Sequence, residues 1–357
     1  MQAISIEGGV TAAQGFLASG MYCGIRKNKS KPDLALIYSK VPCAAAAVYT
    51  QNLVKGAPIQ VTRRNIADGI AQAVICNSGN ANTCNADGEQ KAQMMCEAAA
   101  KVLHLQPEDV VVASTGVIGQ VLPIEPILEA APKLAEMLSE DGSAAAAKAI
   151  MTTDTVVKEV AAEVVIHGKK IRMGGIAKGS GMIHPNMATM LCFLTTDANI
   201  APAVLDQALR LAAKDSFNMV SIDGDTSTND MTAILANGLA GNDPIGYGSV
   251  CSLYRDIARD VRPFSAHGGK GRRRRNEAPG LQCDWRRFGC RCTYSGQGRD
   301  LFQSVEGGHV WCGCQLGACS LRYRLFRRAG GHSPGGRRFC FQGGENRCMR
   351  KWRGHSL

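Results

Sequence analysis

The chain reads Lys178-Gly-Ser-Gly-Met-Ile-His-Pro-Asn-Met-Ala-Thr-Met-Leu191 at the point where a loop leads into a buried strand. The small residues, the proline and the asparagine are typical of a loop. They are followed by an apolar run from Met190 to Leu194, which is typical of a strand with both faces covered. The pattern therefore predicts a buried strand that begins at Thr189.

A threonine at this place has two interpretations. It is an ordinary strand-initiating residue, or, once the Ala188–Thr189 peptide is cut, it carries a free α-amino group beside its hydroxyl. That amine can accept the hydroxyl proton, so one residue would supply both nucleophile and base. His184 in the same stretch is either a general base or a residue that shapes the loop beside Pro185, and the sequence favours the loop role.

A second motif supports the catalytic interpretation. The residues from Val111 to Gly119 form an apolar strand that breaks into a small, glycine-containing turn. Acyl transfer needs hydrogen-bond donors aimed at a developing oxyanion, and backbone N–H groups at a glycine turn plus a threonine hydroxyl can supply them. Taken alone, the Ser-Thr-Gly step at residues 114–116 is more simply a plain turn between a strand and a helix.

These motifs together resemble the ornithine acetyltransferase/glutamate N-acetyltransferase family of arginine biosynthesis. The self-cleavage segment of that family is matched without a break from Lys178 to Leu191, and its STGVIG segment is matched by residues 114–119. Residues 151–155 resemble the TTDT segment of the family, and residues 77–82 and 223–230 resemble two further segments. The resemblance extends over residues 1–260.

The resemblance implies a fold, a processing step and a catalytic centre. The fold would be a layered α/β sandwich, and the chain would cut itself between Ala188 and Thr189 into two fragments that stay together. Thr189 would then be the nucleophile, and Thr115 and Gly116 would form the oxyanion hole. The family also assembles as a heterotetramer of two α and two β chains.

The resemblance implies the substrates as well. Thr152, Lys178 and Thr189 would bind substrate, and an acetyl group would pass from N2-acetylornithine to glutamate. Bifunctional members of the family also use acetyl-CoA as the acetyl donor, and no bound cofactor is implied. The acidic run at residues 223–230 offers oxygen ligands, but it lacks the spacing of a calcium-binding loop, so we expect no metal.

Two other functions stay open. An N-terminal-nucleophile hydrolase or aminopeptidase would use the same residues, with water in place of glutamate as the acyl acceptor. The second alternative is an inactive product, because the family continues beyond Asp260 with a GEGATK segment and later substrate contacts that have no counterpart here.

The composition changes abruptly at this point. Residues 261–357 hold 18 Arg and 2 Lys against 5 acidic residues, whereas residues 1–260 carry a net charge of −4. This tail also contains 8 of the 15 Cys and all 3 Trp, and it contains no Ile. A GC-rich reading frame that is read out of phase yields such a composition. We therefore expect a frameshifted, poorly ordered tail at 261–357, after an α-chain part at 1–188 and a truncated β-chain part at 189–260.

The tail weakens several functional interpretations of the whole chain. The net charge of +11 suggests nucleic-acid binding, but the excess of positive charge lies entirely in the tail, so we expect none. The Cys-X-Cys spacings at 290–292 and 312–314 do not match paired zinc motifs. The chain has no apolar run of about 20 residues and no secretory pattern at its N-terminus, so we expect no membrane partner and a cytoplasmic protein with reduced thiols.

Alternating apolar runs and helical patterns place the elements of an α/β fold. Strands are expected at residues 35–38, 73–76, 110–112, 163–166, 189–194, 219–222 and 232–235, and helices at residues 89–103 and 202–214. His167-Gly168 is expected to form a hairpin turn.

Overall fold

The computed structural model describes residues 3–166, 168–180, 190–215 and 226–246, together with five short strands between residues 281 and 342. The first nine strands are β1 (Ile4–Ile6), β2 (Phe16–Met21), β3 (Leu34–Tyr49), β4 (Ile70–Asn80), β5 (Val110–Val117), β6 (Lys158–Ile166), β7 (Lys169–Lys178), β8 (Leu191–Thr196) and β9 (Met231–Ala236). The α-helices are α1 (Ala57–Asn65), α2 (Gly88–Leu103), α3 (Glu125–Glu136), α4 (Ser143–Ile150) and α5 (Pro202–Asp215), and two short 3₁₀ helices cover Ile66–Asp68 and Pro107–Asp109.

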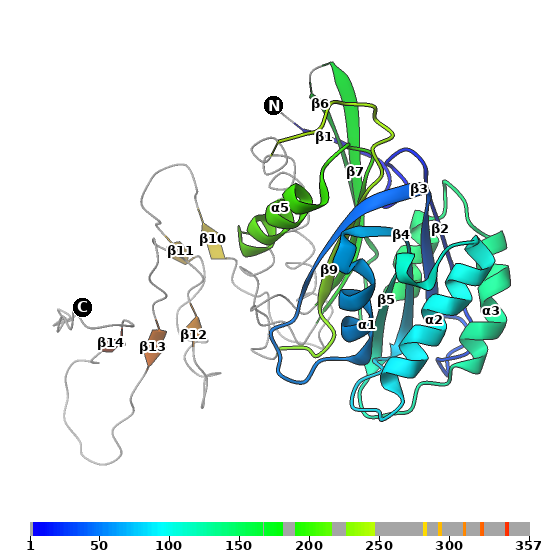
Figure 1. Cartoon of the computed structure of the whole chain (residues 1–357). Coiled ribbons are helices and arrows are strands. Elements are labelled where there is room, and N and C mark those ends of the chain that lie inside the picture. Colours follow the sequence, from blue (N-terminus) through cyan, green and yellow to red (C-terminus); the bar gives the residue numbers. More distant parts are fainter. Residues whose placement is uncertain are drawn as a thin grey trace, which may run out of the picture. The chain divides into compact units, whose positions relative to one another are not determined.

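The nine strands are hydrogen-bonded into one continuous sheet, and the long strand β3 joins its two halves, which form two sheets at an angle to each other. The first half of β3 pairs with β2 on one side and β4 on the other, and its second half pairs with β9. The register with β4 shifts between Tyr38 and Cys43, a stretch that contains Pro42, which cannot donate a ladder hydrogen bond. The strand therefore bends there and passes from one sheet into the other, as Figure 1 shows for the blue ribbon that crosses the molecule.

The nine strands consequently form two packed layers. The first layer has the order β2-β3-β4-β5, and the second has the order β1-β6-β7-β8-β9-β3. Apolar side chains from both layers, among them Val111, Ile176 and Phe193, share one buried cluster. A second cluster joins the first layer to α2 and α3, and a third joins the second layer to α5. The chain is thus a helix–sheet–sheet–helix sandwich, and the expected layered α/β sandwich is confirmed.

The helices on the two outer faces have clear sequence causes. α2 is rich in Ala, Met, Gln and Lys, all good helix formers, and it ends at His104, which takes the left-handed conformation with φ of +58°. Pro202 begins α5, where its missing N–H costs no helical hydrogen bond. α2 and α3 lie side by side over the first layer (Figure 1).

The expected elements largely agree with the structure. Strands and helices occur at all the predicted places within the described residues, and the β6–β7 hairpin pairs Ile166 with Lys169 across Gly168. Some boundaries differ: β8 begins at Leu191, the first residue to pair with both neighbouring strands, and not at Thr189 as expected. β6 begins at Lys158, before the expected start at residue 163. The strand expected at residues 219–222 lies outside the described residues.

The chain divides into two compact units, Met1–Arg274 and Arg275–Leu357. In the second unit the described residues are β10 (Leu281–Cys283), β11 (Cys292–Tyr294), β12 (Val310–Trp311), β13 (Arg322–Arg324) and β14 (Cys340–Gln342). β10 pairs with β11, and β13 pairs with both β12 and β14, in all cases antiparallel. Among all the helices that the structure describes, none combines the length and the apolar character that crossing a membrane requires.

Candidate active site

Thr115 and Gly116 lie at the end of β5, and Thr115 faces the space between the two sheets. Side chains alternate along a strand, and Val111 and Ala113, on the same face as Thr115, belong to the cluster between the sheets. Thr115 is 6% exposed. The strand does not break at the Ser-Thr-Gly step as expected but continues to Val117, because β4 keeps pairing with it through Gly79 and Asn80.

Gly116 cannot be replaced by a larger residue without moving the chain. Its φ is +135°, which L-residues rarely adopt, and a Cβ placed on it would lie 2.3 Å from the carbonyl carbon of Gly79. The absence of a side chain therefore lets β4 and β5 approach closely, and Gly116 itself is exposed at the end of β5. This is the property that an oxyanion hole built from a backbone N–H requires.

Lys178 approaches the same space from the second sheet. It ends β7, where it pairs with Leu191, and by alternation it shares a face with Ile176 of the cluster between the sheets. Burial lowers the pKa of the Lys178 ammonium, while attraction to Asp154 and Asp230 opposes this shift. The Lys178 side chain is thus buried and is attracted to two carboxylates at the edge of the space between the sheets.

A buried ion pair fixes the chain directly after Lys178. Lys158 Nζ lies 2.5 Å from Asp154 Oδ1, and both side chains are at most 3% exposed. Asp154 Oδ1 also accepts the Gly179 N–H at 2.8 Å, and Lys158 Nζ donates to the Gly179 carbonyl. Both polar groups of Gly179 are therefore held by one ion pair.

The charge of Asp154 follows from these contacts. Burial alone would raise the pKa of its carboxyl, but attraction to Lys158 and the hydrogen bonds from Lys158 and Gly179 outweigh burial and lower the pKa. Asp154 Oδ2 accepts the Thr152 N–H at 3.2 Å. The expected substrate residues Thr152 and Lys178 are thus brought together around one carboxylate.

Cys76 is the thiol that faces this cluster. It is fully buried on β4, and burial raises its pKa to about 12, against a smaller opposing effect of Lys178 and Arg26. The thiol is therefore protonated at neutral pH and is a poor nucleophile. Cys43, Cys96 and Cys192 are buried free thiols as well, as the apolar surroundings of these cysteines predict.

Asn229 connects the two sheets at the site. Its Nδ2 donates to the carbonyl oxygens of Ala81 (2.6 Å) and Ser114 (3.0 Å), just beyond β4 and within β5. Its Oδ1 accepts the hydroxyls of Thr83 and Thr228, each at 2.6 Å. Two residues later, β9 begins in the second sheet, so the described end of the 223–230 segment braces the site.

The residues predicted for cleavage, Ala188 and Thr189, lie outside the described residues, as does His184. The chain on either side of them is described. Lys178 pairs with Leu191, and the Met190 carbonyl accepts the N–H of Met231 at 3.1 Å. The described residues on either side of the predicted cleavage bond therefore lie at the end of the sandwich that carries Thr115 and Lys178.

Several residues of the site were missed by the sequence analysis. Asp154 lies within the 151–155 segment, and Lys158, four residues later, was the only indication in the sequence of an Asp154–Lys158 ion pair. Arg26, whose guanidinium donates to the Met151 carbonyl, gave no signal at all. Within the described part of the chain, no group of three His, Cys, Asp or Glu side chains is placed to hold a metal ion.

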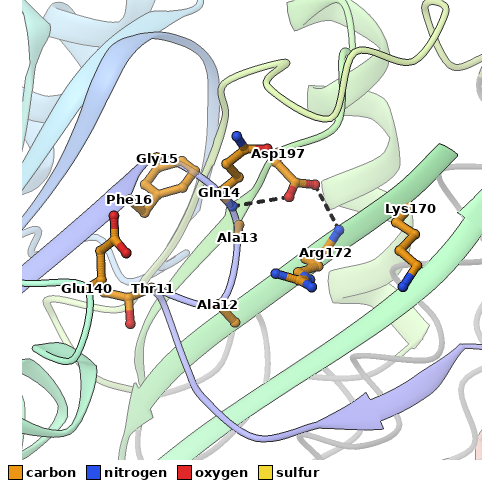
Figure 2. Close-up of a pocket in the computed structure, with 10 residues that line it drawn as sticks. All are labelled: Thr11, Ala12, Ala13, Gln14, Gly15, Phe16, Glu140, Lys170, Arg172 and Asp197. Carbon is orange, nitrogen blue, oxygen red and sulfur yellow. Dashed lines mark hydrogen bonds between the residues drawn. The ribbon is translucent and has the colours of Figure 1, made fainter.

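A cavity of about 330 Å³ lies at the far end of β8 (Figure 2). Asp197 lines it, one residue beyond Thr196 and roughly 20 Å along the strand from Leu191. The carboxylate of Asp197 accepts the N–H groups of Gln14 (3.1 Å) and Arg172 (2.8 Å), as the dashed lines show. These bonds tie a loop to two strands, so the carboxylate has a structural task distant from Thr115.

Comparisons with known proteins agree with the motifs. A model of the ArgJ family matches residues 17–266. The arginine biosynthesis bifunctional protein ArgJ of Symbiobacterium thermophilum is 51% identical over 267 residues, which cover 74% of this chain and 66% of that protein. ArgJ 1 of Clostridium acetobutylicum is 49% identical over 234 residues, which cover 65% of this chain and 57% of that protein.

Among solved structures, an ArgJ protein of Bacillus halodurans is similar with 42% identity and a TM-score of 0.49, over 52% of this chain and 98% of that chain. The present chain spans less than two thirds of the length of the first two curated relatives. The family model nevertheless covers well over half of the chain, and it includes every motif on which the resemblance rests. The protein belongs to the ArgJ family.

Proposed function

We propose that this chain is an acetyltransferase of arginine biosynthesis that moves an acetyl group from N2-acetylornithine to glutamate. The observation that carries the proposal is the placement of Thr115 and Gly116 in one sheet and Lys178 in the other, with Thr152 in the loop after α4, beside the chain that follows Thr189. The relatives named arginine biosynthesis bifunctional protein ArgJ support it. Acetyl-CoA is proposed as a second acetyl donor, and no resident cofactor is part of the proposal.

The first half-reaction forms an acetyl ester on Thr189. After cleavage of the Ala188–Thr189 peptide, the α-amine of Thr189 accepts the hydroxyl proton as Oγ1 attacks the acetyl carbonyl carbon. The Thr115 hydroxyl and the Gly116 N–H donate to the oxyanion. The C–N bond then breaks, the α-ammonium returns the proton to the leaving amine, and ornithine departs.

The second half-reaction reverses these roles. The amine of glutamate attacks the ester carbonyl carbon, the same donors hold the second oxyanion, and Thr189 Oγ1 leaves with the proton that the amine loses. The Lys178 ammonium binds a substrate carboxylate, and Thr152 lies beside it through Asp154. Ping-pong kinetics follow, because one acetyl-enzyme serves both amino acids.

Turnover of N2-acetylornithine with and without glutamate tests this proposal. We expect ornithine release to need glutamate beyond the first turnover, and mass spectrometry to find an acetyl group on the fragment that begins with Thr189. Continued ornithine release in water alone would identify the hydrolase instead. A wild-type chain that never becomes acetylated would favour the inactive product.

Replacing Thr115 with alanine is expected to lower kcat by about 10²-fold, the usual cost of one lost oxyanion donor. The substrate KM should change much less, because the donor acts on charge that develops in the transition state. Steady-state kinetics of Thr115→Ala and Thr115→Ser check this, since serine retains the hydroxyl. A Thr115→Ala defect confined to KM would assign this residue to substrate binding.

We further propose that residues 1–188 and 189–260 are the α-chain and β-chain parts, that two of each assemble, and that residues 261–357 come from a shifted reading frame. The family match ends at residue 266, close to the change in composition, which supports the boundary. Resequencing the gene across codons 255–265 tests it, because a single-base correction there should restore a GEGATK-like continuation. The buried free thiols support a cytoplasmic location.

A further inference from the structure

The buried segment at residues 228–231 spans the two sheets at the candidate site. At its start, the side-chain amide of Asn229, which is 6% exposed, uses both of its hydrogens on main-chain carbonyls of the first sheet. Its oxygen accepts two threonine hydroxyls, so the amide is fully engaged. At its end, Met231 opens β9 in the second sheet.

The bond from Asn229 to the Ser114 carbonyl acts on the oxyanion donors. The Ser114 carbonyl and the Thr115 N–H belong to one rigid peptide plane, so fixing the oxygen fixes the start of Thr115. The next peptide carries the Gly116 N–H. The second hydrogen of Asn229 binds the Ala81 carbonyl, and the Ala81 N–H in turn donates to Val117 at 2.9 Å, directly after Gly116. Asn229 thereby holds the chain on both sides of Gly116.

The other end of the segment acts on the chain that follows the nucleophile. The Met231 N–H donates to the Met190 carbonyl at 3.1 Å, and Met190 directly follows Thr189 in the sequence. Two residues of extended chain span at most about 7 Å, so the segment from Asn229 to Met231 is a short, buried spacer.

We propose that Asn229 is a positioning residue that sets the distance between the oxyanion donors of Thr115 and Gly116 and the chain at Met190. This inference rests on the proposed function, because it takes its meaning from Thr189 as the nucleophile. Asn229 touches no reacting atom in this scheme. It acts through the Ser114–Thr115 peptide on one side and through the β8–β9 ladder on the other.

Asn65 provides a matched control at the opposite end of the same strand. It is also 6% exposed, and its Nδ2 donates to the carbonyl oxygens of Val110 (2.9 Å) and Pro107 (3.1 Å). Val110 is the first residue of β5, whereas Ser114 is near its end. If Asn229 were merely a structural brace, the Asn65 and Asn229 variants would have equal kcat.

The test compares Asn229→Asp with Asn65→Asp in the full chain, and Asn229→Ala with Asn65→Ala where the charged variants do not fold. Aspartate keeps the shape and loses both donors. We expect the Asn229 variants to lower kcat for acetyl transfer by about 10²-fold with little change in KM, because small misplacements of catalytic groups have effects of this size. We expect the Asn65 variants to lower the urea midpoint by a similar amount to the Asn229 variants and to retain kcat.

Amide hydrogen exchange tests the structural effect of Asn229 without relying on the proposed function. Exchange should accelerate at residues 115–117 in the Asn229 variants and at residues 110–112 in the Asn65 variants. Equal kcat in the two sets, or unchanged exchange at Thr115 and Gly116 without Asn229, overturns the inference. Absence of acetyl-Thr189 in the wild type contradicts the proposed function instead, and hydrogen exchange then decides on Asn229.

Discussion

A Thr189→Ala chain is expected to stay in one piece and to transfer no acetyl group. The substitution removes the hydroxyl that, in the proposed mechanism, attacks both the Ala188–Thr189 peptide and the acetyl donor, and loss of a nucleophile costs about 10⁶-fold in turnover. Denaturing gel electrophoresis should show one band for the variant and two for the wild type. N-terminal sequencing should place the start of the second wild-type fragment at Thr189.

Thr189→Ser is the matched control for this experiment. Serine keeps a hydroxyl at the same place and lacks only the methyl group, so the Thr189→Ser chain should still cut itself and should become acetylated. A Thr189→Ala chain that is nevertheless cut, or a wild-type fragment that starts at another residue, would show that the nucleophile is elsewhere. A stable fold of the variant can be checked independently by its urea unfolding curve.

Replacing Lys158 with methionine is expected to lower the free energy of unfolding by about 3–5 kcal/mol, the cost of leaving a buried charge without its partner. The pair lies at 2.5 Å with both side chains at most 3% exposed, and Lys158 is also a donor to the Gly179 carbonyl. Lys91→Met is the control. Lys91 likewise pairs with an aspartate four residues earlier, at 2.8 Å, but Asp87 is 39% exposed. Urea unfolding at pH 7 should show a far smaller loss for Lys91→Met, since exposed pairs contribute little.

The effect of Lys158→Met should depend on pH in a defined direction. Because the pair lowers the pKa of Asp154, its contribution is complete above the ordinary carboxyl pKa near 4 and is lost as the pH falls through the lowered value. The difference in stability between wild type and variant should therefore shrink on acidification. A difference that stayed constant down to pH 2 would show that Asp154 does not titrate with the pair.

The elements that the sequence predicts are those whose apolar pattern is local. β4, β5, β9, α2 and α5 each carry their own period, and each occurs at the expected residues. The second half of β3 was missed, because its Ala44–Ala47 run has low strand propensity and becomes a strand only through pairing with β9. The bend at Pro42, which divides the strands into two layers, could not be predicted from any periodic pattern of apolar residues.

The candidate site was likewise predictable from the sequence only in part. Motifs in short stretches of the sequence identified Thr115, Gly116, Thr152 and Lys178. The residues that hold them were not identified, because their partners are distant in the chain. Asn229 contacts Ser114 across 115 positions, and Asp154 reaches Gly179 across 25. No spacing in the sequence records such contacts, which arise only when two sheets meet.

The place of β8 and β9 within the second sheet determines what self-cleavage would leave behind. Both strands come after residue 188, yet they lie side by side between β7 and β3, which come before it. Both edges of the β8–β9 pair are thus hydrogen-bonded to strands of the earlier fragment, so the cut would leave the two fragments associated. Cleavage would, however, change the reaction order of refolding. An uncut chain refolds as a single molecule at any dilution, whereas the two fragments of a cut protein must first associate. Each molecule could therefore fold unimolecularly only before it is cut.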